Sequence, residues 1–291
     1  MREEKIMQQV LRLAEKGRGH TSPNPMVGAI LDRNGKIVGQ GYHRGAGMPH
    51  AEMEAIKDAG RMADGSTLYV NLEPCCHFGK TPPCTDAIIS AGIKKVVYPV
   101  NDPNPVVNGK GARILKKHGI EVKSGLMAEQ AKKLNEAYFK YQLTGLPFLN
   151  LKIEQTLDGK RTSSPSLTES LLSNSDRKET LRILSADKEI AGMRASRFFT
   201  KGDLIKYLRS LAAEGVLSVI VKGTDGWGAK ILKHRLVDKI CYLIYPEIGG
   251  RRPALEINLG INRISEAWKL SDVHYQNLGR AILVSGYINY N

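Results

Sequence analysis

The chain has 291 residues, of which 42% are hydrophobic and 25% are charged, an ordinary globular composition that excludes disorder, collagen and coiled coil as descriptions of the whole chain. Its formal charge of +14 is evenly spread, with 21 basic and 14 acidic side chains in residues 1–145 and 22 and 15 in residues 146–291. With only 6% aromatic residues, this even charge argues against a nucleic-acid-binding stripe or a base-stacking platform.

The sequence favours a cytoplasmic protein. It holds no apolar stretch long enough to span a bilayer, and its N-terminus predicts an amphipathic helix and not a secretory signal. Of the four cysteines, Cys75, Cys76 and Cys84 lie close together. In the reducing cytoplasm such a cluster is more often metal-binding or catalytic than disulfide-bonded. Cys241 lies in an apolar run and is expected to be a small buried hydrophobic residue.

In the first half, predicted strands alternate with predicted helices, which is typical of the α/β class. Apolar residues at helical spacing predict a first helix over residues 6–14. Two apolar runs on either side of Asn34-Gly35 then predict a β-hairpin. Helices are expected at about 50–59, after Cys84, at 110–117 and, as one long element, at 127–142. The expected strands are 67–72, 96–100 and 120–123.

Residues 144–147, Thr-Gly-Leu-Pro, indicate a linker, so we predict two domains, residues 1–145 and 146–291. The second half shows another alternation of strands and helices. Strands are expected at 148–155, 216–221, 240–245 and 281–288, and helices at 201–214 and 228–234. A Ser/Thr-rich loop is expected at 163–176.

The strongest chemical signal is His50-Ala51-Glu52, followed by Pro74-Cys75 and Cys84. One imidazole and two thiolates supply three of the four ligands that zinc prefers and leave one position for water. Bound zinc lowers the pKa of that water from about 15.7 to about 7, and Glu52 is placed to carry its proton to a leaving amine. This is the pattern of the zinc nucleobase deaminases. A structural zinc site is the alternative, but it would need a fourth ligand and would leave Glu52 without a task.

Eight residues separate Cys75 from Cys84, where the general deaminase pattern has two. Besides this longer loop, five segments carry the family signal: residues 21–28, 41–43, 49–52, 72–84 and 101–105. Together they resemble the deaminase half of the bifunctional deaminase/reductases of riboflavin biosynthesis, a family in which the longer loop occurs. The resemblance covers about residues 5–150 and is specific, because several separate motifs agree in order.

This resemblance implies a cytidine-deaminase-like α/β/α sandwich that removes the 2-amino group of a diaminohydroxy-phosphoribosylaminopyrimidine by hydrolysis. It implies that His50, Cys75 and Cys84 bind zinc, that Glu52 is catalytic, and that Cys76 is a bystander. It further implies a substrate pocket lined by Asn24, His43, His77, Lys80, Asp102 and Asn104. Amide and carboxylate groups suit a polar pyrimidine, and a lysine such as Lys80 suits its phosphate.

Residues 147–291 resemble the reductase half of the same family, at segments 147–152, 156–160, 236–239 and 281–287. This resemblance implies a dihydrofolate-reductase-like α/β domain in which NADPH reduces the ribosyl group to ribityl. Lys152 and Asp158 match the family and are the candidate site residues of this domain.

Two departures from the family predict a diverged reductase-like domain. The stretch between Asp158 and Phe198 is short and lacks the family's Gly-Thr-containing loop and its Asp-Asp-Pro segment. After the strand at 216–221, Lys222-Gly223-Thr224 stands where the family has an acidic residue and two glycines. The change reverses a charge and adds a side chain where a pyrophosphate would approach closely. Use of NADPH is therefore an open alternative.

The leading hypothesis is a zinc-dependent pyrimidine deaminase of riboflavin biosynthesis with a diverged reductase-like domain. One alternative is a deaminase of a related pathway that acts on a similar aminopyrimidine and has an inactive second domain. Another is a base deaminase of tRNA or single-stranded nucleic acid, which the charge permits but its even distribution opposes. We expect a small-molecule substrate and no membrane or nucleic-acid partner, and the resemblance implies a homo-oligomer.

Overall fold

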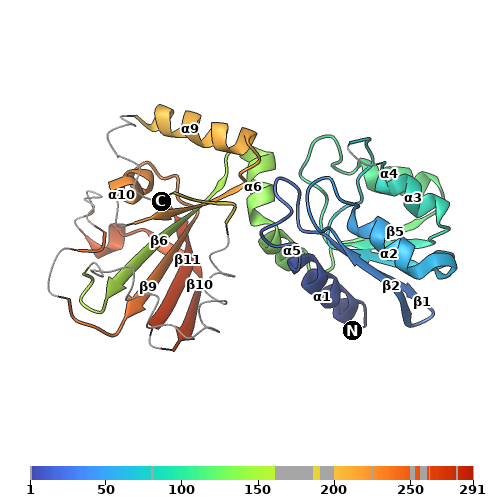
Figure 1. Cartoon of the computed structure of the whole chain (residues 1–291), viewed down its shortest axis with the longest axis horizontal. Coiled ribbons are helices and arrows are strands. Elements are labelled where there is room, and N and C mark those ends of the chain that lie inside the picture. The colour runs from blue at the N-terminus through green and yellow to red at the C-terminus, as the bar shows by residue number, and fades with distance from the viewer. Residues whose placement is uncertain are drawn as a thin grey trace. The chain divides into compact units, whose positions relative to one another are not determined.

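The structure is a computed structural model that describes residues 2–79, 82–160, 186–190, 200–223, 226–249, 253–255, 261, 263–279 and 281–290. The chain forms two units, residues 1–145 and 146–291 (Figure 1). Among the described residues, none of the helices combines the length and the apolar character that a bilayer crossing requires.

The first unit is built on a five-stranded sheet in the order β2-β1-β3-β4-β5. Its strands are β1 (Gly28–Arg33), β2 (Lys36–Tyr42), β3 (Thr67–Val70), β4 (Lys95–Tyr98) and β5 (Glu121–Ser124). β1 is antiparallel to β2 and β3, whereas β3, β4 and β5 run parallel. The predicted hairpin is confirmed: Asn34 and Gly35 both have positive φ, 49° and 85°, as the tight turn of a two-residue hairpin requires.

Helices cover both faces of this sheet. The helices α2 (Ala51–Ala59), α3 (Cys84–Ser90) and α4 (Lys110–Lys117) lie on one face, and α1 (Arg2–Glu15) lies on the other beside α5 (Ala128–Leu134) (Figure 1). Because successive strand residues point to opposite faces, Leu68 and Val70 pack under α2–α4, whereas Tyr69 packs with Met7 and Val10 of α1. The predicted α/β/α sandwich is confirmed.

The single long helix predicted at 127–142 is wrong, because the chain forms two helices there, α5 and α6 (Glu136–Thr144). Asn135 separates them. Its buried side chain accepts the backbone N–H of Met26 at 2.8 Å and donates to the carbonyl oxygen of Met26 at 2.9 Å. Asn71 also donates to that oxygen and accepts the N–H of Gly28. These amide contacts hold the segment that precedes β1 in place. The helix α5 ends at Asn135, because the side chain of Asn135 bonds to the backbone of that segment.

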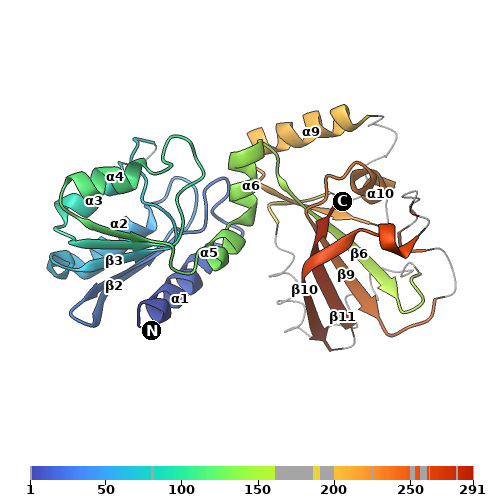
Figure 2. The ribbon, with the colours of Figure 1, turned by 180° about the vertical axis from the view of Figure 1, so that it is seen from behind.

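The second unit contains a six-stranded mixed sheet in the order β10-β11-β9-β6-β8-β7. The strands are β6 (Phe148–Thr156), β7 (Lys188–Ile190), β8 (Ser218–Lys222), β9 (Lys239–Tyr245), β10 (Lys269–Leu278) and β11 (Ala281–Asn289). The helices α9 (Lys201–Ala213) and α10 (Gly226–Lys233) pack on one face through Leu204, Leu208, Trp227 and Ile231. Figure 2 shows the β10–β11 hairpin and α10 from behind. A second α/β domain is thus confirmed.

Two strands of the second sheet were not predicted. β7 has only three residues, and β10 is an edge strand in which the buried residues do not alternate regularly with exposed ones. An exposed edge strand gives little period-2 signal, because one face and one edge both meet water. The Ser/Thr-rich loop predicted at 163–176 lies outside the described residues.

Candidate active site

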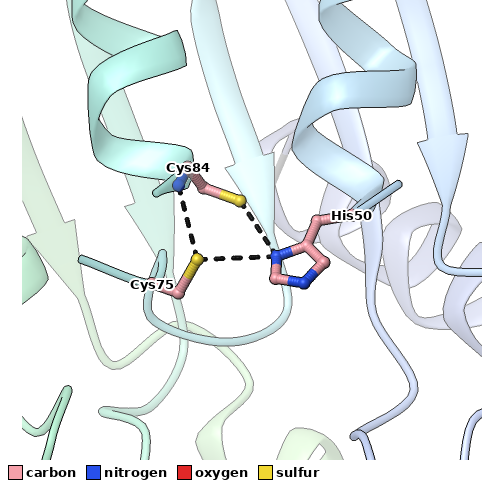
Figure 3. Close-up of side chains that lie close together, drawn as sticks. All are labelled: His50, Cys75 and Cys84. Carbon is pink, nitrogen blue, oxygen red and sulfur yellow. Dashed lines mark hydrogen bonds between the residues drawn. The ribbon is translucent and has the colours of Figure 1, made fainter. Parts of the chain in front are cut away.

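Three separate elements bring His50, Cys75 and Cys84 together. His50 immediately precedes α2, Cys75 lies in the loop after β3, and Cys84 is the first residue of α3. The Nδ1 atom of His50 lies 3.2 Å from Sγ of Cys84 and 3.5 Å from Sγ of Cys75. The backbone N–H of Cys84 donates to Sγ of Cys75 at 3.3 Å. Figure 3 shows both sulfur atoms turned toward the same nitrogen of the imidazole ring.

The two thiols differ in their electrostatic surroundings. The pKa of Cys75 is lowered to about 4, first by the hydrogen bond from the Cys84 thiol and also by His50. The pKa of Cys84 is raised, because its thiol donates to Cys75 and because it is buried. Cys75 is therefore prepared as a thiolate, which is the form of cysteine that binds metals.

The donor set fits a zinc ion. One imidazole nitrogen and two sulfur atoms lie within 4.8 Å of one another, and no further group of three such ligands occurs in the described part of the chain. Nitrogen and sulfur are the ligands that zinc prefers, and a site with three protein ligands keeps a position for water or substrate. Cys76 lies outside this group, with its thiol 3.9 Å from the carbonyl oxygen of Val106.

Glu52 lies in the first turn of α2, two residues after His50, with only 4% of its surface exposed. Burial raises the pKa of its carboxyl group, and the neighbouring Cys75 adds to this effect. A raised pKa makes a carboxyl group take up a proton more readily, and a general acid–base group must both accept and return one.

A cavity of about 400 Å³ opens beside this cluster. Its walls include His50, Glu52 and Cys75, together with five of the six residues that the sequence predicts for the substrate pocket: Asn24, His43, His77, Asp102 and Asn104. The sixth, Lys80, lies outside the described residues. The structure thus brings the predicted zinc ligands, the predicted proton carrier and the described pocket residues to one place.

His43 lines the cavity and also orients the side chain of Asn24. Nδ1 of His43 lies 3.0 Å from the carbonyl oxygen of Pro49, and its Nε2 lies 3.1 Å from Nδ2 of Asn24. Burial lowers the pKa of His43, which favours the neutral ring, with Nδ1–H donating to Pro49 and Nε2 accepting from the amide. Asn24 then keeps its amide oxygen for a donor in the cavity.

Sequence reasoning missed three cavity residues of α6: Tyr138, Tyr141 and Gln142. Their i, i+3, i+4 spacing places them on one face of the helix. The hydroxyl of Tyr138 donates to Oδ1 of Asp102 at 2.9 Å. The i, i+3, i+4 spacing predicts that the three side chains share one face of the helix, but it does not predict that this face lines the cavity.

Glu73 is a further cavity residue that was not singled out, although it directly precedes the Pro74-Cys75 motif. Its carboxylate is 3% exposed. It accepts backbone N–H groups from Asp102 at 3.2 Å, Gly109 at 2.9 Å and Ala112 at 3.1 Å. Glu73 therefore satisfies free N–H groups at the start of α4 and also holds the loop that carries Asp102 and Asn104.

In the second unit, Lys152 lies on β6 and forms an ion pair with Glu154. Asp158 lies in the turn after β6, where its Oδ1 accepts from the Thr156 hydroxyl and from the N–H of Gly249. Lys222, which replaces an acidic residue of the family pattern, is paired with Glu189 of β7 at 2.7 Å. Most of the stretch between Asp158 and Phe198 lies outside the described residues.

Comparisons with known proteins agree with this geometry. The family model for the cytidine and deoxycytidylate deaminase zinc-binding region matches residues 1–100. The riboflavin biosynthesis protein RibD of Aquifex aeolicus is 34% identical over 343 aligned positions, which cover 96% of each chain. A diaminohydroxyphosphoribosylamino-pyrimidine deaminase of Buchnera aphidicola is 51% identical over 147 residues, which are 50% of this chain and all of that protein. A solved deaminase/5-amino-6-(5-phosphoribosylamino)uracil reductase of Thermotoga maritima covers 99% of both chains with a TM-score of 0.80 and 28% identity.

Proposed function

We infer the function of this chain from its family, because the chain belongs to the RibD riboflavin biosynthesis proteins. It is a zinc-dependent hydrolytic deaminase, and its second half corresponds to the reductase half of that family. The observation that carries the deaminase assignment is the meeting of His50, Cys75 and Cys84 beside the buried Glu52, on the wall of one cavity.

We propose that His50, Cys75 and Cys84 hold the zinc ion. When bound, zinc lowers the pKa of water so that hydroxide becomes available near neutral pH. Glu52 takes up a proton from the attacking water and delivers it to the departing amine. Water adds at the amino-bearing ring carbon, the C–N bond breaks, and ammonia leaves as the ring gains a carbonyl group. The raised pKa of Glu52 supports this role, because the group must change its protonation state twice in each cycle.

The substrate that we propose is the compound named for the relatives, a diaminohydroxyphosphoribosylaminopyrimidine. The cavity supports this choice, because it combines amide, carboxylate and imidazole groups with apolar walls. Asn24 would accept from a ring amino or N–H group, and Asp102 and Asn104 would bind further polar groups of the substrate. His77 lines the same wall, and the side chain of Lys80 is assigned to the phosphate because of its charge.

We propose that the second unit is a diverged form of the family's NADPH-dependent reductase, with Lys152 and Asp158 as its candidate residues. The sequence departures between Asp158 and Phe198 and at Lys222-Gly223-Thr224 support divergence. The alignment with the Aquifex protein is 343 positions long, so at least about 50 of its positions have no counterpart in this 291-residue chain. The pairing of Lys222 with Glu189 of the neighbouring strand supports a local adjustment, because the two charges compensate each other at the surface.

One experiment tests both halves. The purified zinc-loaded chain is given the proposed pyrimidine with and without NADPH, and the products are identified by mass spectrometry. Loss of one amino group for a carbonyl, independent of NADPH, is expected from the deaminase. A further gain of two hydrogen atoms only with NADPH would show an active reductase. An unchanged substrate would contradict the proposed deaminase function.

We further propose that the chain assembles into a homo-oligomer and acts in the cytoplasm. The family resemblance supports the assembly. None of Cys75, Cys76, Cys84 and Cys241 is in a disulfide, which supports a reducing compartment. Light scattering of the purified chain would test the assembly, and a mass equal to that of one chain at micromolar concentration would contradict it.

A further inference from the structure

Asp102 is a buried carboxylate that is satisfied on one side only. It lines the cavity and is 6% exposed. Its Oδ1 atom accepts two hydrogen bonds, from the backbone N–H of Asn104 at 2.8 Å and from the hydroxyl of Tyr138 at 2.9 Å. No donor from the described residues reaches Oδ2. Oδ2 is not among the fully buried polar atoms that lack a partner, so it is open to the cavity, where a ligand that takes the place of water can donate a hydrogen bond to it.

The Tyr138 hydroxyl is well placed to fix the orientation of this carboxylate. Tyr138 is 7% exposed, and it comes from α6, whereas Asp102 comes from the loop after β4. Burial and the Asp102 carboxylate both raise the pKa of Tyr138, so the phenol keeps its proton. Since the bond joins two elements and is shielded from water, it restricts the rotation of the carboxylate more than a bond at the surface would.

The backbone of Asp102 is held independently. Its N–H donates to the buried carboxylate of Glu73. The main chain at residue 102 is therefore fixed without Tyr138, and the Tyr138 hydroxyl acts on the side chain. This separation allows the contribution of Tyr138 to be measured without displacing the loop.

We propose that Tyr138 is a positioning residue of the deaminase site. By holding Oδ1 of Asp102, it turns Oδ2 toward the cavity, where Oδ2 accepts a hydrogen bond from a hydroxyl or N–H group of the substrate. Tyr138 thereby selects substrates that carry a donor at that position. This inference rests on the proposed function, because it takes the cavity to be the substrate site of the deaminase.

The test is Tyr138→Phe in the full-length zinc-loaded chain, with Tyr98→Phe as the matched control. Tyr98 is also buried, and its hydroxyl donates at the same distance, 2.9 Å, to Asn101, the residue before Asp102. Asn101 is not among the residues that line the cavity. Each substitution removes one phenol hydroxyl that donates to the loop after β4, at Asn101 or at Asp102, but only Tyr138→Phe affects a side chain that lines the cavity.

For Tyr138→Phe we expect the KM for the proposed pyrimidine to rise about tenfold, the size expected when a hydrogen bond to a charged group is lost. The kcat should stay within about threefold, because this interaction is made in the ground state and in the transition state alike. Zinc content should be unchanged, and Tyr98→Phe should keep the wild-type KM and kcat.

Three results would overturn the role of Tyr138: an unchanged KM in Tyr138→Phe, a loss of zinc together with kcat, or an equal rise of KM in Tyr98→Phe. The last two would indicate a general loosening of the loop. The wild-type chain is measured first, since its failure to deaminate the compound would contradict the proposed function itself and not the role of Tyr138 alone.

Discussion

The buried carboxylate of Glu73 accepts the backbone N–H of Asp102 at 3.2 Å, so a residue two positions before Cys75 holds another residue that lines the cavity. The same carboxylate binds the N–H groups of Gly109 and Ala112 at the start of α4. A negative charge at a helix N-terminus is favourable, because it meets free N–H groups and the positive end of the helix dipole. Glu73, which lies just before the loop that carries Cys75, therefore connects that loop to the start of α4 and to the loop that carries Asp102.

This arrangement predicts that Gly111 tolerates no side chain. A Cβ atom at Gly111 would lie 2.2 Å from the carbonyl oxygen of Pro74 and 3.3 Å from Oε1 of Glu73. Although alanine favours helix by up to about 1 kcal/mol over glycine, the clash with backbone should outweigh this gain. We expect Gly111→Ala to lower the free energy of unfolding by about 1–3 kcal/mol in urea titrations.

Gly202 offers the contrasting substitution. It also lies in a helix, α9, but the nearest atom to its added Cβ is the Thr200 hydroxyl at 3.5 Å. Gly202→Ala should therefore be neutral or slightly stabilising. Equal stability of Gly111→Ala and the wild-type chain would show that α4 can move away from Pro74.

The adjacent cysteines should differ sharply in their effect on zinc. Cys75 faces His50 and receives the N–H of Cys84, whereas Cys76 points to the Val106 carbonyl. Serine is a poor zinc ligand in place of a thiolate, because its hydroxyl stays protonated. We expect Cys75→Ser to lose zinc and deaminase activity, and Cys76→Ser to keep both. Metal analysis by mass spectrometry checks this, and zinc loss from Cys76→Ser instead would contradict the ligand assignment.

Glu52 and Glu54 provide a matched pair in the first turn of α2. Glu52 is buried in the cavity wall, whereas Glu54 is half-buried, does not line the cavity and forms a long ion pair with Arg44 at 3.9 Å. Glu52→Gln should retain zinc but lower kcat by at least about 100-fold, since the glutamine amide cannot carry a proton.

Glu54→Gln should leave kcat unchanged, because its carboxyl group does not reach the cavity. Full turnover by Glu52→Gln would refute the proposed proton carrier, even if zinc analysis confirmed the metal site.

The first unit should show a pH-dependent contribution from Glu3. Its carboxylate meets Lys123 at 2.6 Å and Lys95 at 3.7 Å, which links α1 to β5 and β4. The hydrogen bond from Lys123 is the largest cause that lowers the pKa of Glu3 below its usual value of 4.5. A lowered pKa in the folded state means that stabilisation is present above pH 4.5 and is lost as the pH falls through the folded-state pKa.

Because the side chains of Glu3 and Lys123 are 31% and 49% exposed, water screens the pair, and the effect should be below about 1 kcal/mol and weaker in high salt. We expect Glu3→Gln to reduce the free energy of unfolding at pH 7 and to match the wild-type chain at pH values below the folded-state pKa. Urea titrations at several pH values measure this difference. A larger difference in acid than at pH 7 would reverse the assigned sign.

The parts of the molecule that could be predicted from sequence are those whose signal is local. The hairpin at Asn34-Gly35 depends on two neighbouring residues that tolerate positive φ. The meeting of His50, Cys75 and Cys84 was predictable because few residue types bind zinc, so these three stand out although they lie far apart in the chain.

The unpredicted parts depend on partners distant in sequence. Asn135 ends α5 through Met26, which is 109 residues away, and nothing in the apolar periodicity of residues 127–142 indicates that break. Tyr138 and Glu73 likewise act on the Asp102 loop through bonds that span 36 and 29 residues. A single buried acid or phenol leaves no hydrophobic periodicity in the sequence. Its role can be recognised only from the three-dimensional structure, which shows the loops that it contacts.

The position of α6 determines where this chain can be divided into independent proteins. α6 supplies Tyr138 to the catalytic cavity and ends at Thr144, and β6 of the next unit begins only four residues later at Phe148. A fragment that ended before Glu136 would retain every proposed zinc ligand but would lack Tyr138, Tyr141 and Gln142, which line the cavity. Any self-sufficient deaminase obtained by splitting the gene must therefore extend through Thr144, a length close to that of the separate Buchnera enzyme.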